Sequence, residues 1–254
     1  MYALFRWVFL WILTSCRDVS GQETFQETSL QRKIRIKRIM ATENYLLLGQ
    51  KRRMIEGLRE KGITDENVLG AFDKMERHLF LESLLWPRAY EDEALKLATD
   101  QTISKPSTVA FQSQLLEVSK GMKVLEIGTG SGFQAAILYA MGARVFTVER
   151  QITLFNRTRP LLSKLAPTVV TRYGDGFKGF PQFAPYDRVI VTCGAPEIPQ
   201  ALVDQLVVDG IMVIPVGEES QVMKRIVKIS DSEYEEEDFG DFVFVPMLKE
   251  RVRK

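Results

Sequence analysis

The stretch "VLEIGTGSGF", Val124 to Phe133, decides the fold. It reads as a buried strand followed at once by a glycine-rich turn and the start of a helix, an arrangement that cradles nucleotide-like ligands. Gly128, Gly130 and Gly132 spell G-x-G-x-G. Phe133 stands where the dinucleotide fingerprint G-x-G-x-x-G needs its third glycine, which argues against a bound pyrophosphate.

Two carboxylates around this turn narrow the choice of ligand. Glu126 comes just before Gly128, where it would repel a pyrophosphate and suit a cation. Glu149 ends the next strand, where an acidic side chain can accept both ribose hydroxyls. An adenosine with a positive charge and no phosphate fits these points, so we expect S-adenosylmethionine as cofactor. A surface charge at a strand end is the alternative reading of Glu149.

Outward from the turn, apolar strands alternate with helices. This pattern predicts a doubly wound α/β fold with a mostly parallel seven-stranded sheet of the S-adenosylmethionine-dependent methyltransferase type, after an N-terminal helical extension. Strands are expected at residues 122–127, 144–149, 168–173, 186–192 and 210–216, and helices at 131–141, 151–166 and 198–207. Residues 222–230 and 241–248 are expected to form an antiparallel edge, separated by a solvated acidic turn, "DSEYEEED", at 231–238.

Ahead of this core, helices are predicted at residues 43–62 and 64–75, the second capped by Thr64 or Asp65. Loops and short pieces follow, and another helix is expected to start near Pro106. We therefore expect a methyltransferase domain at 40–254. It would comprise N-terminal helices and an active-site loop (40–105), a cofactor-binding core (106–217) and C-terminal strands (218–254).

Residues 1–39 differ from the rest of the chain. "LFRWVFLWILTSC" resembles a short secretory signal, and "LTSC" resembles a bacterial lipoprotein processing box at Cys16. Residues 17–29 are polar and 30–38 are basic, and we interpret both as disordered or linker-like. The alternative is an upstream extension from a misassigned start, with Met40 as the true first residue.

Composition excludes several classes of function. A net charge of +1 gives no strong field for nucleic acid, and no apolar run is long enough to insert stably in a membrane. Cys16 and Cys193 make neither a disulfide framework nor a zinc site, and no metal is expected. His78 is the sole histidine, which rules out mechanisms that need two imidazoles. For His78 a structural role is favoured, and for Cys193 a buried one.

The acceptor must be a group that needs no general base. Methyltransferases acting on base or amide nitrogens carry an Asn/Asp-Pro-Pro-aromatic turn after the fourth strand, and "VIVTCGAP", 189–196, has none. A carboxylate is ionised at neutral pH and is ready to attack. The loop "DQTISKP", 100–106, places the hydroxyls of Thr102 and Ser104 before a helix N-terminus, a small anion site. Capping of that helix by Ser104 is the alternative.

From about Met40 to Leu248 the chain resembles the protein-L-isoaspartate (D-aspartate) O-methyltransferase family. Six motifs in order carry the resemblance: "RMIEGLREKGITDENVL", "ERHLF…AYED", "QTISKP", "VLEIGTGSGFQAAIL", "YGDGFKGFP" and "APYDRVIVTCGAPEIP". The departures are "ATDQTIS", which lacks a glycine two residues before the glutamine, "SKP" for "SQP", and "TCGAP" for "TAAAP". These departures bear on loop mobility and substrate preference.

The resemblance implies a repair enzyme. It would methylate the free carboxyl of L-isoaspartyl and D-aspartyl residues in damaged proteins with S-adenosylmethionine, so that a succinimide can form. It further implies that Ser104 is the active-site residue, that Asp175 and Gly176 lie by the adenine, and that Thr192 lies near the substrate. We expect a cytoplasmic monomer. Two alternatives remain: another S-adenosylmethionine enzyme, or a catalytically silent binding module anchored at Cys16.

Overall fold

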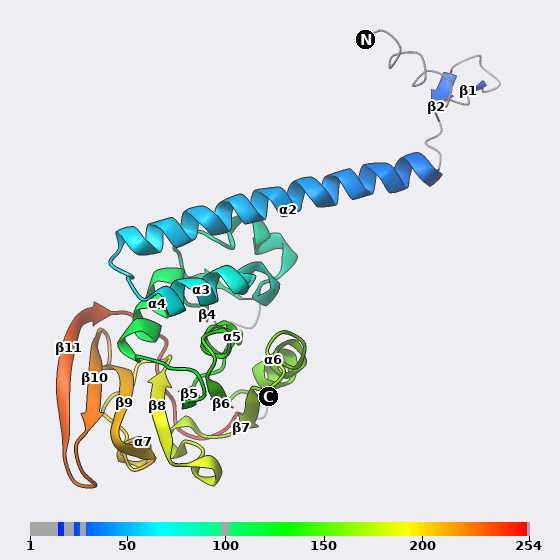
Figure 1. The fold of residues 1–254 in the computed structure, drawn as a ribbon. Coiled ribbons are helices and arrows are strands. Elements are labelled where there is room, and N and C mark those ends of the chain that lie inside the picture. Colours follow the sequence, from blue (N-terminus) through cyan, green and yellow to red (C-terminus); the bar gives the residue numbers. More distant parts are fainter. Residues whose placement is uncertain (1–14, 18–22, 26–28, 98–101, 253–254) are drawn as a thin grey trace. The chain divides into compact units, whose positions relative to one another are not determined.

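The computed structural model describes residues 15–17, 23–25, 29–97 and 102–252 (Figure 1). The chain divides into two compact units, Met1–Leu48 and Gly49–Lys254. In the first, β1 (Ser15–Arg17) pairs antiparallel with β2 (Glu23–Phe25). The long helix α2 (Ser29–Glu60) starts in the first unit and ends in the second.

The helix α2 corrects one expectation. The basic run 30–38, expected to be linker-like, is helical. No proline or glycine interrupts residues 29–48, and Leu, Gln, Lys and Arg are good helix formers, so a helix continues through the run despite its charge. The two compact units divide after Leu48, and the start of the methyltransferase domain at residue 40 stays a prediction. Most of the signal-like stretch lies outside the described residues.

The second unit is built on the predicted seven-stranded sheet, in the order β11-β10-β9-β8-β5-β6-β7 (Figure 1). Five strands are parallel, and β10 and β11 are antiparallel at one edge. The strand order reverses at β5, which lies between β6 and β8. Ligands of open α/β sheets bind at such a reversal, outside the carboxyl ends of the strands. The strands are β5 (Lys123–Ile127), β6 (Arg144–Glu149), β7 (Val170–Tyr173), β8 (Tyr186–Val191), β9 (Leu206–Val216), β10 (Gln221–Lys228) and β11 (Tyr234–Phe242).

Helices pack on the sheet through a continuous apolar core. Val124, Leu125, Val189 and Ile190 are fully buried, as expected for central parallel strands covered on both faces. The predicted cap Asp65 is confirmed, because its carboxylate accepts from the backbone N–H of Asn67 at 2.8 Å. The α-helices of this part are α3 (Glu66–Lys74), α4 (Pro106–Leu115), α5 (Phe133–Ala140), α6 (Ile152–Leu165) and α7 (Gln200–Val203).

Shorter pieces fill the segment between α3 and α4, as expected. They are the 3-10 helices η1 (Arg77–Phe80) and η2 (Ser83–Arg88) and the strand pair β3 (Leu95–Lys96) and β4 (Thr102–Ile103). Two further 3-10 turns, η3 (Gly176–Lys178) and η4 (Pro181–Phe183), follow β7. Thr102 lies in β4, and Ser104 lies between β4 and the start of α4.

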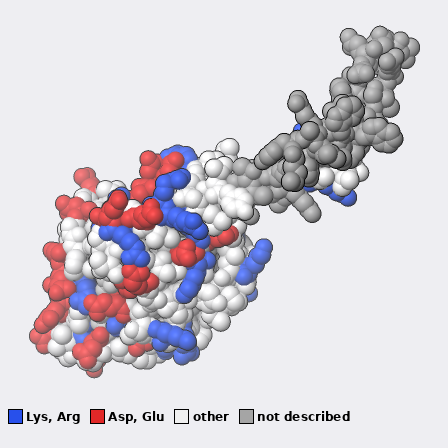
Figure 2. Space-filling model, turned by 45° about the horizontal axis from the view of Figure 1, so that its top comes forward, with Lys and Arg blue, Asp and Glu red and all other residues white. Residues whose placement is uncertain are grey.

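The C-terminal edge differs from the prediction. Most of the acidic run expected to be a turn lies in β11, and residues 243–248, expected to be a strand, are not in β11. Cross-strand ion pairs stabilise the acidic strand: Lys224 contacts Glu236 and Asp238, and Arg225 contacts Glu237. Acidic side chains gather on the side where β11 lies (Figure 2). The helix α7 is shorter than predicted because β9 already begins at Leu206.

Candidate active site

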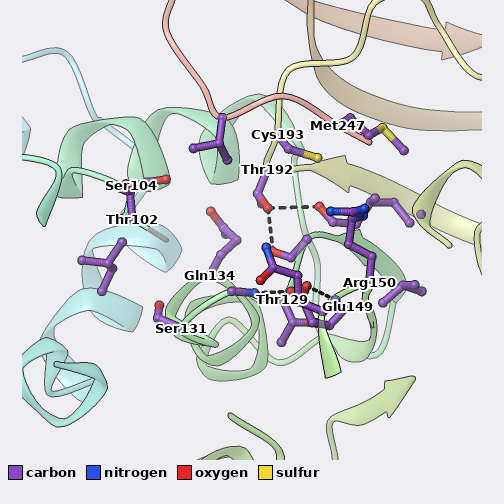
Figure 3. Close-up of a pocket in the computed structure, with 18 of the residues that line it drawn as sticks. Thr102, Ser104, Thr129, Ser131, Gln134, Glu149, Arg150, Thr192, Cys193 and Met247 are labelled. Atoms are coloured by element: carbon purple, nitrogen blue, oxygen red, sulfur yellow. Dashed lines mark hydrogen bonds between the residues drawn. The ribbon is translucent and has the colours of Figure 1, made fainter. Parts of the chain in front are cut away.

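A cavity of about 310 Å³ opens at the carboxyl ends of β5, β6 and β8. Figure 3 shows Thr102, Ser104, Ser131 and Gln134 on one side of it, and Glu149 and Arg150 on the other. Its size is within the range of small-molecule and cofactor sites. The lining residues are Thr102–Ser104, Val109, Gln112, Ile127–Ser131, Phe133, Gln134, Val148–Gln151, Gly176, Thr192, Cys193 and Val245–Leu248.

Gly128 lines the cavity where the end of β5 packs closely against Thr192. Its φ is +96°, and a β-carbon there would lie 2.6 Å from the Oγ1 atom of Thr192. Thr192 in turn holds the end of β5, because its hydroxyl lies 2.7 Å from the carbonyl oxygen of Gly128 and 3.0 Å from that of Ile127. Only glycine combines this backbone angle with this approach. Gly128 and Thr192 therefore lie against each other in the lining of the cavity.

The other two glycines of the turn have different roles. Gly130 lines the cavity, and its N–H donates to Glu149 at 2.9 Å. Gly132 is the N-cap residue of α5 and is not among the lining residues. A β-carbon on Gly132 would lie 2.7 Å from Thr158 of α6. The structure thus gives Gly132 a packing role between two helices, and does not place it against a ligand.

Glu149 lies at the end of β6 with its carboxylate held at the cavity wall. One oxygen accepts from the N–H of Gly130, and the other accepts from the N–H of Gln151, both at 2.9 Å. The side chain is 5% exposed, and burial raises the pKa of its carboxyl. Each oxygen keeps a second lone pair, so the carboxylate can still accept from a ligand hydroxyl.

Glu126 lies elsewhere than expected. Its side chain is fully buried and is absent from the cavity lining. Burial raises the pKa of this carboxyl to about 8, so most of it is protonated at pH 7. The prediction that Glu126 faces a cationic ligand as a carboxylate is therefore not supported by its position.

Asp175 and Gly176 follow β7. Gly176 lines the cavity, and a β-carbon there would lie 2.5 Å from Ile127. Asp175 does not line it. Its carboxylate instead caps η3 by accepting from the N–H of Phe177 at 3.0 Å, and it also accepts from the N–H of Glu250 at 3.2 Å. In this structure Asp175 shapes the adjoining loop, and Gly176 offers the direct contact surface.

Ser104 and Thr102 line the cavity on the side opposite Glu149 (Figure 3). The alternative of helix capping by Ser104 is wrong: the N-cap residue of α4 is Lys105, without a side-chain cap bond. The N–H of Ser107 in the first turn is instead satisfied by Asp92 at 2.7 Å. Among the described residues, the hydroxyl of Ser104 is therefore not used to cap α4. Asp100 and Gln101 of the same loop lie outside the described residues.

Several lining residues were missed by the sequence reasoning. Gln112 and Gln134 come from α4 and α5, and Arg150 follows Glu149. The C-terminal segment 245–248 reaches the cavity because Gly194 pairs with it: the N–H of Gly194 donates to Val245 at 2.8 Å, and the N–H of Met247 donates to Gly194 at 2.7 Å. No local sequence pattern indicates the contact between Gly194 and residues 245–248. Gln134 could have been found, because it stands directly after the motif "VLEIGTGSGF".

The remaining candidate nucleophile and base are not activated. Cys193 lines the cavity, but burial raises the pKa of its thiol to about 12, so it stays protonated. His78 lies outside the cavity lining, bonded to the hydroxyl of Tyr90 at 2.8 Å and packed against Trp86. Burial lowers the pKa of His78. Both positions agree with the structural roles favoured from the sequence.

Comparisons with known proteins agree on one family. The family model described as protein-L-isoaspartate (D-aspartate) O-methyltransferase matches residues 49–252. The protein-L-isoaspartate O-methyltransferase of Christiangramia forsetii is 49% identical over 82% of this chain and 99% of its own. That of Flavobacterium psychrophilum is 52% identical over 80% of this chain and 96% of its own.

Solved structures agree with these relatives. A protein-L-isoaspartate O-methyltransferase superposes with a TM-score of 0.72 at 28% identity, over 77% of this chain and 65% of that one. A Plasmodium falciparum structure in complex with S-adenosyl-L-homocysteine has a TM-score of 0.69 at 22% identity, over 78% of this chain and 97% of that one, and shares the fold. The chain belongs to the protein-L-isoaspartate (D-aspartate) O-methyltransferase family.

Proposed function

We propose that the cavity holds S-adenosylmethionine on its Glu149 side and an isoaspartyl carboxylate on its Ser104 side. The chain is an S-adenosylmethionine-dependent protein-L-isoaspartate O-methyltransferase by family, and this assignment says which residues perform the reaction. One observation carries it: a single cavity joins the glycine turn and Glu149 to the hydroxyls of Thr102 and Ser104. Methylation of an isoaspartyl peptide tests it.

The donor side is assigned by chemistry. Glu149 offers free lone pairs for the two ribose hydroxyls, and Gly176 lines the same cavity, where the adenine would lie. Gly128 and Gly130 let the backbone approach the ligand closely, because they carry no side chain. The solved structure from Plasmodium falciparum is a complex with S-adenosyl-L-homocysteine, the demethylated cofactor.

The acceptor side needs no base. S-adenosylmethionine supplies an electrophilic methyl group on a sulfonium, and an ionised carboxylate can attack it directly. Ser104 holds and orients the carboxylate, because alignment governs such a displacement. Ile103 and Val109 are buried beside them and help to exclude water. The substrates are damaged proteins that contain isoaspartyl residues, and we propose that the enzyme acts as a monomer.

Replacing Glu149 with alanine should weaken binding of S-adenosylhomocysteine by roughly 1–3 kcal/mol, the scale of hydrogen bonds to a charged group. The variant also leaves the N–H groups of Gly130 and Gln151 without their acceptor, so thermal melting must be followed alongside. Calorimetry on the wild type and the variant measures the affinity. Unchanged affinity in a folded variant would refute the ribose assignment.

We also propose that the enzyme works in the cytoplasm and that residues 1–39 are dispensable. S-adenosylmethionine is made in the cytosol, so an exported enzyme would lack its donor. The family match starts only at residue 49, and no helix among the described residues is long and apolar enough to cross a membrane. A chain starting at Met40 should keep its melting temperature and turnover. Native protein lipidated at Cys16 would contradict the proposal.

A further inference from the structure

Gln134 has a buried polar atom that nothing in the described protein satisfies. It is the second residue of α5, its side chain is 7% exposed, and it lines the cavity. Its amide oxygen is buried without a hydrogen-bond partner. A buried acceptor left unpaired is costly, so such an atom at a cavity wall indicates a donor on the ligand.

The orientation of this amide follows from its neighbour Ser113 in α4. The hydroxyl of Ser113 donates its one hydrogen to the carbonyl of Val109 at 2.7 Å. It can therefore only accept from Gln134, whose amide nitrogen lies 2.9 Å away. This fixes the nitrogen of Gln134 against α4, so the oxygen is the amide atom left without a partner.

We propose that the amide oxygen of Gln134 accepts a hydrogen bond from the ammonium of the methionyl end of S-adenosylmethionine. The inference rests on the proposed placement of the donor in this cavity. With the ribose at Glu149, the methionyl end extends away from that residue, and Figure 3 shows Gln134 on the side of the cavity opposite Glu149. An ammonium carries three donors and no acceptor, so it requires oxygens such as this one.

Two ligands could donate a hydrogen bond to Gln134, the acceptor peptide and S-adenosylmethionine, and burial distinguishes between them. Ser104 and Thr102 are half-buried, so an acceptor peptide can reach them from the mouth of the cavity. Gln134 is buried, so a small enclosed ligand is better placed to contact it than an extended peptide chain. Among the described lining residues, Glu149 and Arg150 are the charged ones, and Figure 3 shows both on the opposite side. The ammonium therefore meets a neutral acceptor here.

The test compares two ligands on two variants. S-adenosylhomocysteine carries the ammonium, and its desamino analogue keeps the adenosine, thioether and carboxylate. Gln134→Leu should lower the affinity for S-adenosylhomocysteine by roughly 10- to 100-fold and change that for the analogue less than threefold. Gln134→Glu keeps an acceptor and should bind S-adenosylhomocysteine within about threefold of wild type.

An unchanged ratio of the two affinities in Gln134→Leu would overturn the inference. So would unchanged S-adenosylhomocysteine binding together with a raised KM for an isoaspartyl peptide, because Gln134 would then face the acceptor. If Gln134→Leu does not fold, the Gln134→Glu variant decides: loss of S-adenosylhomocysteine affinity in that folded protein contradicts the inference. A third result is that the wild type binds S-adenosylhomocysteine and loses that affinity in Gln134→Leu, yet fails to methylate the peptide. That result would refute the proposed acceptor and leave this inference standing.

Discussion

Replacing Gly128 with alanine is expected to destabilise the protein by about 2–4 kcal/mol, the combined scale of a strained backbone angle and an overpacked contact. The φ of +96° disfavours any side chain, and the new methyl group would overlap the Oγ1 atom of Thr192. Thr192 cannot retreat freely, because its hydroxyl is bonded to the end of β5. Denaturant unfolding measures the loss, and calorimetry should show weaker binding of S-adenosylhomocysteine.

Gly130→Ala is the matched control for this variant. Its φ is +53°, and the nearest atom to an added β-carbon is 3.9 Å away, so only the left-handed backbone is penalised. The free protein should lose about 1 kcal/mol, the cost of that conformation for an ordinary residue. Equal losses in the two variants would show that the contact with Thr192 does not limit the turn.

Replacing Ser104 with alanine should lower kcat/KM for an isoaspartyl peptide by roughly 10- to 100-fold, the value of a hydrogen bond to a charged group. Its affinity for S-adenosylhomocysteine should stay the same, because Ser104 lies across the cavity from Glu149 (Figure 3). The α4 helix should also stay intact, since Asp92 and not Ser104 satisfies its first turn. Steady-state kinetics and calorimetry separate the two effects.

Lys105→Ala provides the comparison for Ser104. Lys105 is the exposed neighbour at the N-cap of α4, and it makes no side-chain cap bond. Its replacement should leave kcat/KM within about twofold. A Ser104→Ala variant with wild-type kinetics, or one that loses cofactor affinity in parallel, would remove Ser104 from the acceptor side.

The sequence predicts the parts of this site that depend on local pattern. The glycine turn, the strand ending in Glu149 and the proline that starts α4 each follow from spacing and residue type, and the structure confirms the elements that carry them. Burial is less predictable. Glu126 precedes the turn in sequence, yet its side chain lies out of the cavity, and whether a strand residue faces the ligand depends on how the strand is packed.

Contacts between distant segments could not be predicted. Residues 245–248 line the cavity because Gly194 bonds to them across the chain, and nothing in "FVPML" indicates this. Likewise, the acidic run became strand β11 because Lys224 and Arg225 lie opposite it, whereas its composition alone favours a solvated turn. The buried oxygen of Gln134 is a third case, since its orientation depends on Ser113 in another helix.

The central claim is that this cavity transfers a methyl group to the carboxylate of isoaspartate. Isoaspartate routes the main chain through its side-chain carbonyl and leaves the α-carboxylate free on a shorter arm, so the site must read backbone position as well as charge. The most direct measurement gives the enzyme two matched peptides, one isoaspartyl and one aspartyl, with labelled S-adenosylmethionine. The account predicts base-labile methyl ester on the isoaspartyl peptide and almost none on the aspartyl one. Equal methylation of both peptides, or label recovered on nitrogen, would contradict it.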